Sequence, residues 1–232
     1  MTFADNTNIA VAAGATLTLA DPVVIKAGKT VTRTGAGALA IQAPLSIEAG
    51  GTLALGAGAM TVSGVPSLAS EARIDVAGET LLVDYHGQQS PAAAIASQLS
   101  SGYSQGEWNG EGIMTSAGTY AMGLGWIDDS SEQTVRIQFT YNGDADLSGT
   151  VDSTDFNALL AGYGQTLGAV WANGDFNYDN KVDTRDFNAL AGNFGAVVSI
   201  ASLGAAVPEP ASGAALLLCA LAGIRPRRVR VV

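Results

Sequence analysis

The sequence contains few charged, aromatic, histidine and cysteine residues. Of its 232 residues, 14% are charged and 6% are aromatic, whereas 47% are hydrophobic and 29 are glycine. The lone cysteine, Cys219, excludes an intramolecular disulfide. The lone histidine, His86, has no nucleophile arranged near it in the sequence, so we expect a solvated or hydrogen-bonded structural role. Many small residues with few charges favour stacked β-structure over a large enzyme core.

Basic residues are also scarce. The chain has 11 basic and 21 acidic residues, and four of the 11 are arginines that follow Glu209, after which no acidic residue occurs. The rest of the chain is therefore strongly acidic, which argues against nucleic acid as a partner and favours a calcium-dependent extracellular protein. The N-terminus shows no basic region followed by a long apolar run, so no signal peptide is visible.

Residues 1–66 form an internal repeat. Pro22, Pro44 and Pro66 are evenly spaced by 22 residues, residues 23–31 align with 45–53, and each unit holds three short alternating segments separated by small residues. This pattern predicts one coil of a β-solenoid per unit, with a β-sandwich of ordinary hairpins as the alternative. It resembles the β-strand repeats of autotransporter-type surface proteins.

A solenoid needs about three coils or more to bury a continuous core, and this repeat barely reaches that number. Together with the missing signal peptide, this leads us to expect that the chain is the C-terminal piece of a longer exported protein.

Residues 67–142 are predicted to form a β-rich module that caps the solenoid. We expect two strands around Gly78, a helix over 90–99 with Ser90 as N-cap and Pro91 at its first position, and further strands over 120–127 and 135–141. The stretch from Gly102 to Ile113 is similar to a segment of planctomycete-type exported proteins. This resemblance implies no role for the segment.

A catalytic alternative for this region uses Glu107 and Glu111 as the carboxylate pair of a glycosidase. The two residues lie in a glycine-rich stretch, and separated carboxylates of this kind are common by chance. Trp108, Trp126 and Tyr103 are candidates for stacking on sugar rings, but packing in the core or the cap is the expected role for so few aromatic residues.

Residues 144–155 and 175–186 are near-copies of one acidic loop. Each places oxygen-bearing side chains at positions 1, 3, 5, 9 and 12 and a backbone carbonyl at position 7, the oxygen shell that Ca²⁺ prefers. The predicted ligands of two Ca²⁺ ions are Asp144, Asp146, Ser148, Thr150, Asp152, Asp155, Asp175, Asn177, Asp179, Lys181, Asp183 and Asp186. Gly149 and Asn180 at position 6 suit a turn with positive φ. Two aspartate-rich solvent turns without a cation are the alternative.

The residues around these loops give a second regularity. Val151 and Val182 at position 8 favour a short strand pair that ties the loops back to back, and matching short helices over 156–164 and 187–195 are expected to start at position 12 and end at a glycine. No helical pattern precedes either loop. A tandem loop–helix closed by aspartate at position 12 resembles a type I dockerin, over residues 143–195.

The resemblance to dockerins implies a small α-helical module that binds a cohesin-like protein through loop positions 10 and 11. These positions are Ser153 and Thr154 in the first copy and Thr184 and Arg185 in the second. The first pair matches the Ser-Thr type of dockerins, whereas the second departs from it and argues against symmetric binding in two orientations.

Residues 207–232 follow a linker at 196–206 and combine three features in order. A Pro-Glu-Pro motif precedes an apolar run at 211–224, and arginines follow it; the residues concerned are Pro208, Glu209, Pro210, Arg225, Arg227 and Arg228. This order resembles a PEP-CTERM sorting signal and implies an exosortase-type processing enzyme as a partner. A helix of this run spans about 21 Å, short of the roughly 30 Å of a bilayer core, which favours a transient membrane segment cleaved near the motif. A plain tail anchor and a buried C-terminal helix are the alternatives.

The sequence thus predicts a mostly β, exported, non-catalytic protein: a short β-solenoid with a β-rich cap, a calcium-loaded dockerin-like module and a C-terminal hydrophobic sorting helix. Its expected function is attachment at the cell envelope or cell surface by docking to a cohesin-like partner. The alternative is the C-terminal fragment of a dockerin-bearing glycoside hydrolase that degrades polysaccharide. A third hypothesis is a solenoid that itself binds polysaccharide.

Overall fold

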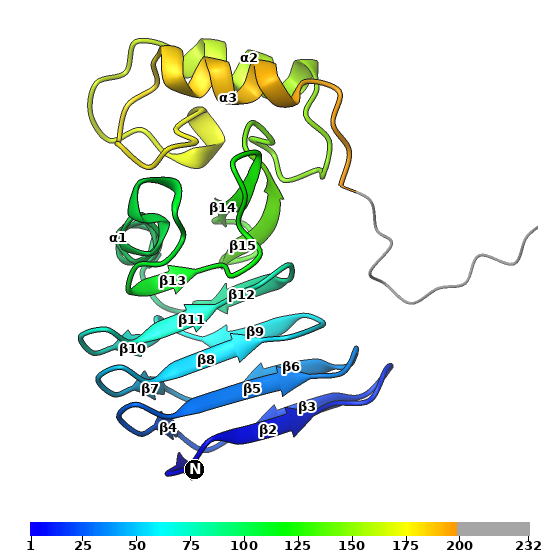
Figure 1. Ribbon diagram of the computed structural model, residues 1–232, viewed down its shortest axis with the longest axis vertical. Coiled ribbons are helices and arrows are strands. Elements are labelled where there is room, and N and C mark those ends of the chain that lie inside the picture. Colours follow the sequence, from blue (N-terminus) through cyan, green and yellow to red (C-terminus); the bar gives the residue numbers. More distant parts are fainter. Residues whose placement is uncertain (199–232) are drawn as a thin grey trace, which may run out of the picture. The chain divides into compact units, whose positions relative to one another are not determined.

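The computed structural model describes residues 1–198, which contain fifteen strands, three α-helices and two 3₁₀ turns (Figure 1). No helix in this range is long and apolar enough to cross a membrane. The predicted segment 211–224 and the sorting motif lie outside the described residues, as does most of the predicted linker.

The first twelve strands form four turns of three strands each (Figure 1). The first turn contains β1 (Thr2–Phe3), β2 (Thr7–Ala10) and β3 (Thr16–Leu19), and the second β4 (Val23–Ile25), β5 (Thr30–Thr34) and β6 (Ala38–Ile41). The third contains β7 (Leu45–Ile47), β8 (Thr52–Leu55) and β9 (Met60–Ser63), and the fourth β10 (Ser67–Leu68), β11 (Arg73–Asp75) and β12 (Thr80–Asp84). Each strand pairs in parallel with its equivalents in the neighbouring turns, so the turns build three parallel sheets.

The register stacks equivalent apolar side chains inside the turns. Ile25 lies beside Ile47, Val31 beside Leu53, and every second residue of these strands is buried. Because buried residues alternate along the strands of the second and third turns, each sheet has one apolar face there, and the three faces enclose a single core. The predicted β-solenoid is therefore confirmed with about four turns, and the β-sandwich of hairpins is wrong because the strands of successive turns run parallel.

The solenoid continues past residue 66, where the sequence analysis places its end. β11 pairs with β8 through Ile74 and Leu53, and β12 pairs with β9 through Val83 and Val62. The two strands expected around Gly78 are present, but they belong to the fourth turn of the solenoid. The sequence obscures this turn because its second corner, at 76–79, lacks the Gly-Ala-Gly pattern of the two turns before it.

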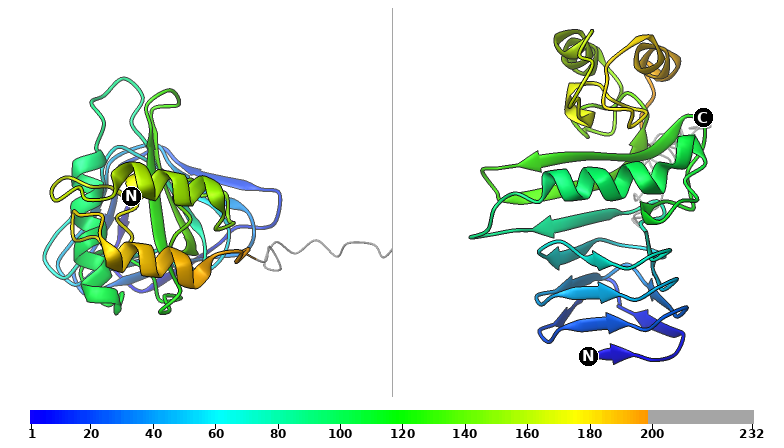
Figure 2. Two further views of the ribbon diagram at one scale, coloured as in Figure 1. Left: turned by 90° about the horizontal axis from the view of Figure 1, so that it is seen from above. Right: turned by 90° about the vertical axis from the view of Figure 1, so that its left-hand side faces the viewer.

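The end of the fourth turn is covered by α1 (Ala92–Tyr103) and by three strands, β13 (Gly112–Met114), β14 (Met122–Asp129) and β15 (Thr134–Tyr141) (Figures 1 and 2). β13 extends one sheet in parallel, whereas β15 pairs antiparallel with β12 and with β14. The helix buries Ile95 and Leu99. The predicted helix and both later strands are confirmed, but Pro91 is the N-cap, and Ser90 Oγ accepts from the amide of Ala92.

The chain after β15 contains two loop–helix units. The first loop leads into α2 (Ser153–Gly162), and the second leads into α3 (Thr184–Asn193). A 3₁₀ turn at Trp171–Asn173 precedes the second loop, and another, at Ser104–Gly106, follows α1. The two helices lie side by side (Figure 2) and contact each other through the rings of Phe156 and Phe187, whose centroids are 6.4 Å apart. The described residues, 1–198, belong to one compact unit.

Both helices begin earlier than expected, at loop position 10 rather than position 12. Asp152 and Asp183, at position 9, are the N-caps, and each accepts a hydrogen bond from the backbone two residues later. Asp155 and Asp186 bond back to the N-cap amides and complete a capping box. This reciprocal capping nucleates the helix at the residue that follows position 9.

Candidate metal centre

The first loop folds around the carboxylate of Asp144. Its oxygens accept hydrogen bonds from the amides of Ser148 and Gly149, both at 3.0 Å, and from the hydroxyl of Thr140. Asp155 closes the loop from the other end, because its Oδ1 accepts from the amide of Ala145 at 2.7 Å. The chain is thereby wrapped so that the carboxylates of its first and last positions face the same interior.

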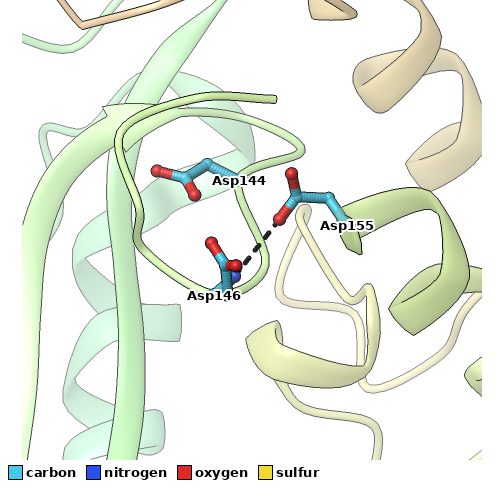
Figure 3. A group of neighbouring side chains, drawn as sticks. All are labelled: Asp144, Asp146 and Asp155. Carbon is cyan, nitrogen blue, oxygen red and sulfur yellow. Dashed lines mark hydrogen bonds between the residues drawn. The ribbon is translucent and has the colours of Figure 1, made fainter. Parts of the chain in front are cut away.

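Carboxylate oxygens of Asp144, Asp146 and Asp155 all lie within 4.8 Å of one another (Figure 3). Asp144 and Asp155 are buried, while Asp146 is exposed at the mouth of the loop. The hydroxyl of Ser148 donates to the carbonyl of Thr150 at 3.2 Å, so positions 5 and 7 are neighbours. The carboxylates of positions 1, 3 and 12 are thus gathered around one point, and the amide of position 5 bonds to the first two of them.

The second loop repeats these contacts. Asp175 accepts from the amides of Asp179 and Asn180 at 3.2 and 2.9 Å, as Asp144 does in the first loop. Asp186 accepts from the amide of Phe176 at 2.9 Å, in the manner of Asp155. Asn177 Oδ1 accepts from the amide of Asp179 at 2.9 Å, which matches the bond from Ser148 N to Asp146 Oδ1. Two segments that differ at eight of their twelve positions therefore fold in the same way.

Backbone conformation is also shared between the loops. Gly149 and Asn180, at position 6, have φ values of 84° and 63°, as the sequence predicts. Leu147 and Tyr178, at position 4, have φ values of 55° and 59°. Leucine and tyrosine rarely adopt a positive φ, so the loop conformation and the contacts of these two side chains must hold the backbone in the left-handed region.

The electrostatics of both loops favour a bound cation. Asp144, Asp155, Asp175 and Asp186 are at most 4% exposed, and none of them belongs to an ion pair within residues 1–198. Burial raises the pKa of Asp144, Asp155 and Asp186, and burial together with the neighbouring Asp186 raises the pKa of Asp175 to about 7. Buried carboxylates without a cationic partner are costly, and a divalent ion among them removes that cost. The donor set thus fits Ca²⁺, which accepts oxygen ligands in a flexible shell.

The expected pairing of Val151 with Val182 is wrong. Val151 exchanges backbone hydrogen bonds with the segment after α3, through Gly195 N and Ala196 O. Val182 pairs in the same way with the segment after α2. Its carbonyl accepts from the amide of Gly164, and its amide donates to the carbonyl of Gln165. Each loop is therefore tied to the exit of the other unit's helix, and the two loops are joined crosswise.

Three contacts of the loops were not expected from the sequence. Thr140 is buried in β15 and donates to Asp144, and Trp171 Nε1 donates to the carbonyl oxygen of Asp144 at 2.7 Å. Leu147 and Tyr178 are buried against β14 and not in the interior of the loops. A large apolar residue at the same position of two polar loops is the one sequence signal that pointed to this packing.

The predicted partner-binding residues lie at the first turns of the helices. Ser153 and Thr154 are the first two residues of α2, and Thr184 and Arg185 are the first two of α3. All four side chains are exposed. The remaining predicted ligands also lie in the two loops: Asp152 and Asp183 cap the helices, and Lys181 donates its amide to Asp179 at 3.0 Å.

The other candidates from the sequence have structural contacts. His86 is exposed, and its Nδ1 bonds to Asp84. Trp108 and Trp126 are 3% and 5% exposed, so both pack in the core as expected. Glu111, one member of the glycosidase alternative, accepts a hydrogen bond from the amide of Glu71 at 2.7 Å.

The comparisons with known proteins add no relative. No family model matches the chain, and no curated protein or solved structure matches it either.

Proposed function

We propose that residues 143–195 bind two Ca²⁺ ions in a dockerin-like module that attaches the β-solenoid to a cohesin-like protein. The observation that carries the proposal is the repetition, in two loops, of buried carboxylates at positions 1 and 12 that accept equivalent backbone hydrogen bonds. Helix capping explains the aspartates at positions 9 and 12, but it gives no reason for buried aspartates at position 1.

The two ions have a structural role in this proposal. Each neutralises the carboxylates at positions 1 and 12 and fixes the loop that presents the first turn of a helix. Asp146 and Asn177 at position 3, and Ser148 and Asp179 at position 5, complete the two shells with oxygen ligands. Because the ligands surround the ion, its contribution is to folding and to the position of the helices and not to chemistry on a substrate.

The first turns of α2 and α3 form the proposed docking surface. Ser153 and Thr154 present small hydroxyl side chains beside each other, and Arg185 gives the second helix a charged residue at the equivalent place. The two helices are thus unlike at this point, which favours one orientation of the partner over the other. Four exposed apolar side chains on and just after these helices are available for the same surface; they are Leu160, Tyr163, Phe187 and Phe194.

The sorting part of the proposal concerns residues 207–232. We propose that this PEP-CTERM-like tail directs an exported protein to the cell envelope and is cleaved near Pro208–Pro210 by an exosortase-type enzyme. Peptide mapping of the protein recovered from its native host tests this part. C-terminal peptides that end near Pro210 support it, and intact Arg227-Arg228 in secreted protein contradicts it.

Calorimetric titration tests the calcium sites, and a binding assay with a panel of cohesin-like proteins tests the docking surface. We expect two bound Ca²⁺ per chain, and we expect Asp144→Ala with Asp175→Ala to abolish binding. Replacing Ser153 and Thr154 together by arginine is expected to weaken partner binding with both ions retained, whereas Thr18→Arg on the exposed face of β3 leaves it unchanged. If the variant with arginine at 153 and 154 bound the partner as well as Thr18→Arg does, the assignment of the docking surface would be refuted.

A further inference from the structure

The two calcium loops are docked on the cap of the solenoid through the residues at their fourth positions. Leu147 of the first loop and Tyr178 of the second both have positive φ and both are buried, at 3% and 8% exposure. The hydroxyl of Tyr178 donates to the carbonyl of Leu124 in β14. The rings of Tyr178 and Trp108 lie edge to face at 5.9 Å, so the second loop also contacts the aromatic core of the cap.

Glycines in β14 create the space for this contact. A methyl group at Gly125 would lie 2.6 Å from Leu147 Cδ2 and 2.6 Å from Trp171 Cε2. At Gly123 it would lie 2.5 Å from Trp108 Cζ2, the ring against which Tyr178 packs. Such approaches are too close for any side chain, so β14 presents a flat backbone surface on which the loop residues and the tryptophans lie.

Polar contacts complete the interface. Arg136 of β15 donates to the carbonyl of Asp146 at 3.3 Å, and Ser100 of α1 donates to the carbonyl of Tyr178 at 3.3 Å. The side-chain amide of Asn193, at the end of α3, donates to the carbonyls of Ala121 and Asn142 at 3.1 and 2.7 Å. Three of these seven groups belong to the loop–helix units, namely the carbonyls of Asp146 and Tyr178 and the side-chain amide of Asn193, and none of the three is a proposed cation ligand.

The contact is incomplete on the side of α1. A cavity of about 510 Å³ separates part of this helix from the second loop, and its walls include Ala96, Ser100, Trp126, Trp171 and Asp175. The module is therefore held mainly on β14 and at the end of α3. An interface of this kind, with small residues on one wall and a large gap, is easier to open than a filled core.

We propose that Ca²⁺ binding to the two loops and docking of the loop–helix units on β14 are thermodynamically coupled through Leu147 and Tyr178. Position 4 lies between two ligand positions, and its left-handed backbone is required both to close the loop and to direct the side chain onto β14. Closing the loop around the ion therefore stabilises the docked state, and loss of the ion releases the units from the solenoid cap. This inference rests on the calcium sites of the proposed function and adds a conformational response to them.

Coupling is reciprocal, so a change that blocks docking must weaken Ca²⁺ binding by the same factor. Gly125→Ala blocks docking without altering any proposed ligand, and we expect its Ca²⁺ affinity to fall by about 5- to 150-fold, the usual range of such couplings. Gly192→Ala is the matched control, because a methyl group at this exposed position of α3 meets no atom within 4 Å. Its affinity is expected to equal that of the original protein.

Hydrogen exchange of the full chain with Ca²⁺ and with a chelator tests the same coupling without a substitution. We expect the amides of β14, residues 122–129, to exchange at least about tenfold faster in chelator, while those of β5 and β8 in the middle of the solenoid keep their rates. If Gly125→Ala fails to fold by circular dichroism, this comparison decides alone.

The outcomes separate the coupling from the calcium sites. Ca²⁺ binding in the titration with unchanged exchange in β14 would overturn the coupling and leave the sites in place. An affinity of Gly125→Ala equal to that of Gly192→Ala would overturn it as well. Absence of Ca²⁺ binding by the original protein would overturn both the coupling and the proposed sites.

Discussion

The indole nitrogen of Trp171 donates a 2.7 Å hydrogen bond to the carbonyl oxygen of Asp144. Asp144 opens the first loop, and Trp171 lies in the 3₁₀ turn that leads into the second, so this bond joins the two loops directly. The crosswise pairing of Val151 with the end of α3 and of Val182 with the end of α2 joins them a second time. The loops are therefore parts of one folded unit and not two independent sites.

The bond between Trp171 and Asp144 is expected to contribute measurably to stability. Trp171→Phe keeps a ring that packs against Phe176 but leaves the buried carbonyl of Asp144 without this donor. We expect the free energy of unfolding to fall by about 1–3 kcal/mol, the cost of an unsatisfied buried group, in addition to the loss of ring volume. Urea denaturation measures it. Trp126→Phe, a buried indole of β14, is the control for the change in ring size.

Removal of calcium is expected to destabilise the loop–helix units. An ion that binds only the folded chain stabilises it by about 2.7 kcal/mol per site at a hundredfold excess of free ion over Kd, and we apply this to the two proposed sites. We therefore expect a chelator to lower the melting temperature measured by circular dichroism, and we expect Asp144→Ala with Asp175→Ala to remove this response. A melting temperature independent of calcium in the original protein would contradict the structural role of the ions.

The calcium-free protein is expected to lose stability as the pH rises from 5 to 7.5. Burial raises the pKa of Asp175 to about 7, above an unfolded value of about 3.9. Between these values the folded state binds more protons than the unfolded state, so the stability is greatest below the unfolded pKa and is lost as the pH rises through the folded pKa. The raised pKa of Asp144, Asp155 and Asp186 acts in the same direction.

Urea denaturation in chelator at the two pH values measures this effect. Asp175→Asn is the control, because it removes the titrating group and is expected to reduce the pH dependence. Glu48, Asp84 and Asp129 have lowered pKa values, so their contributions are lost only at more acid pH, outside the window. A calcium-free protein that became more stable between pH 5 and 7.5 would refute the prediction.

Much of the solenoid was predictable because its repeat is local. Alternation of small and apolar residues over three to five positions fixes which side chains face inward, and the even spacing of Pro22, Pro44 and Pro66 fixes the register. The fourth turn was not predictable from the same signal. Residues 74–81 resemble residues 47–53, which form the first corner of the third turn. In the structure, however, Ile74 lies in the second strand of its own turn and pairs with Leu53, because the strands of the turn below impose the register.

The loops were predictable as ligand patterns, but their surroundings were not. Positions 1 to 12 carry the oxygen pattern within one short segment, so the sequence alone suffices to propose them. The docking of Leu147 on Gly125, by contrast, joins residues of separate elements, and neither residue has a neighbour in the sequence that indicates the other. Contacts of this type depend on how β14 pairs with β15, which no local pattern specifies.

A last prediction concerns Arg33 in the solenoid. This residue is completely buried in β5, and none of its three side-chain nitrogens has a hydrogen-bond partner. Burial lowers the pKa of the guanidinium, and the nearby charge of Glu79 opposes this only in part.

A buried charged group without partners costs more than a neutral one, for which the cost is about 1–3 kcal/mol. We therefore expect Arg33→Met, which fills the same space with an apolar chain, to raise the free energy of unfolding by at least about 1 kcal/mol. Arg73→Met, at an exposed position of β11, is the matched control and is expected to change it by less than about 0.5 kcal/mol. Urea denaturation of both variants measures the difference, and a less stable Arg33→Met would show that the guanidinium finds partners inside the solenoid.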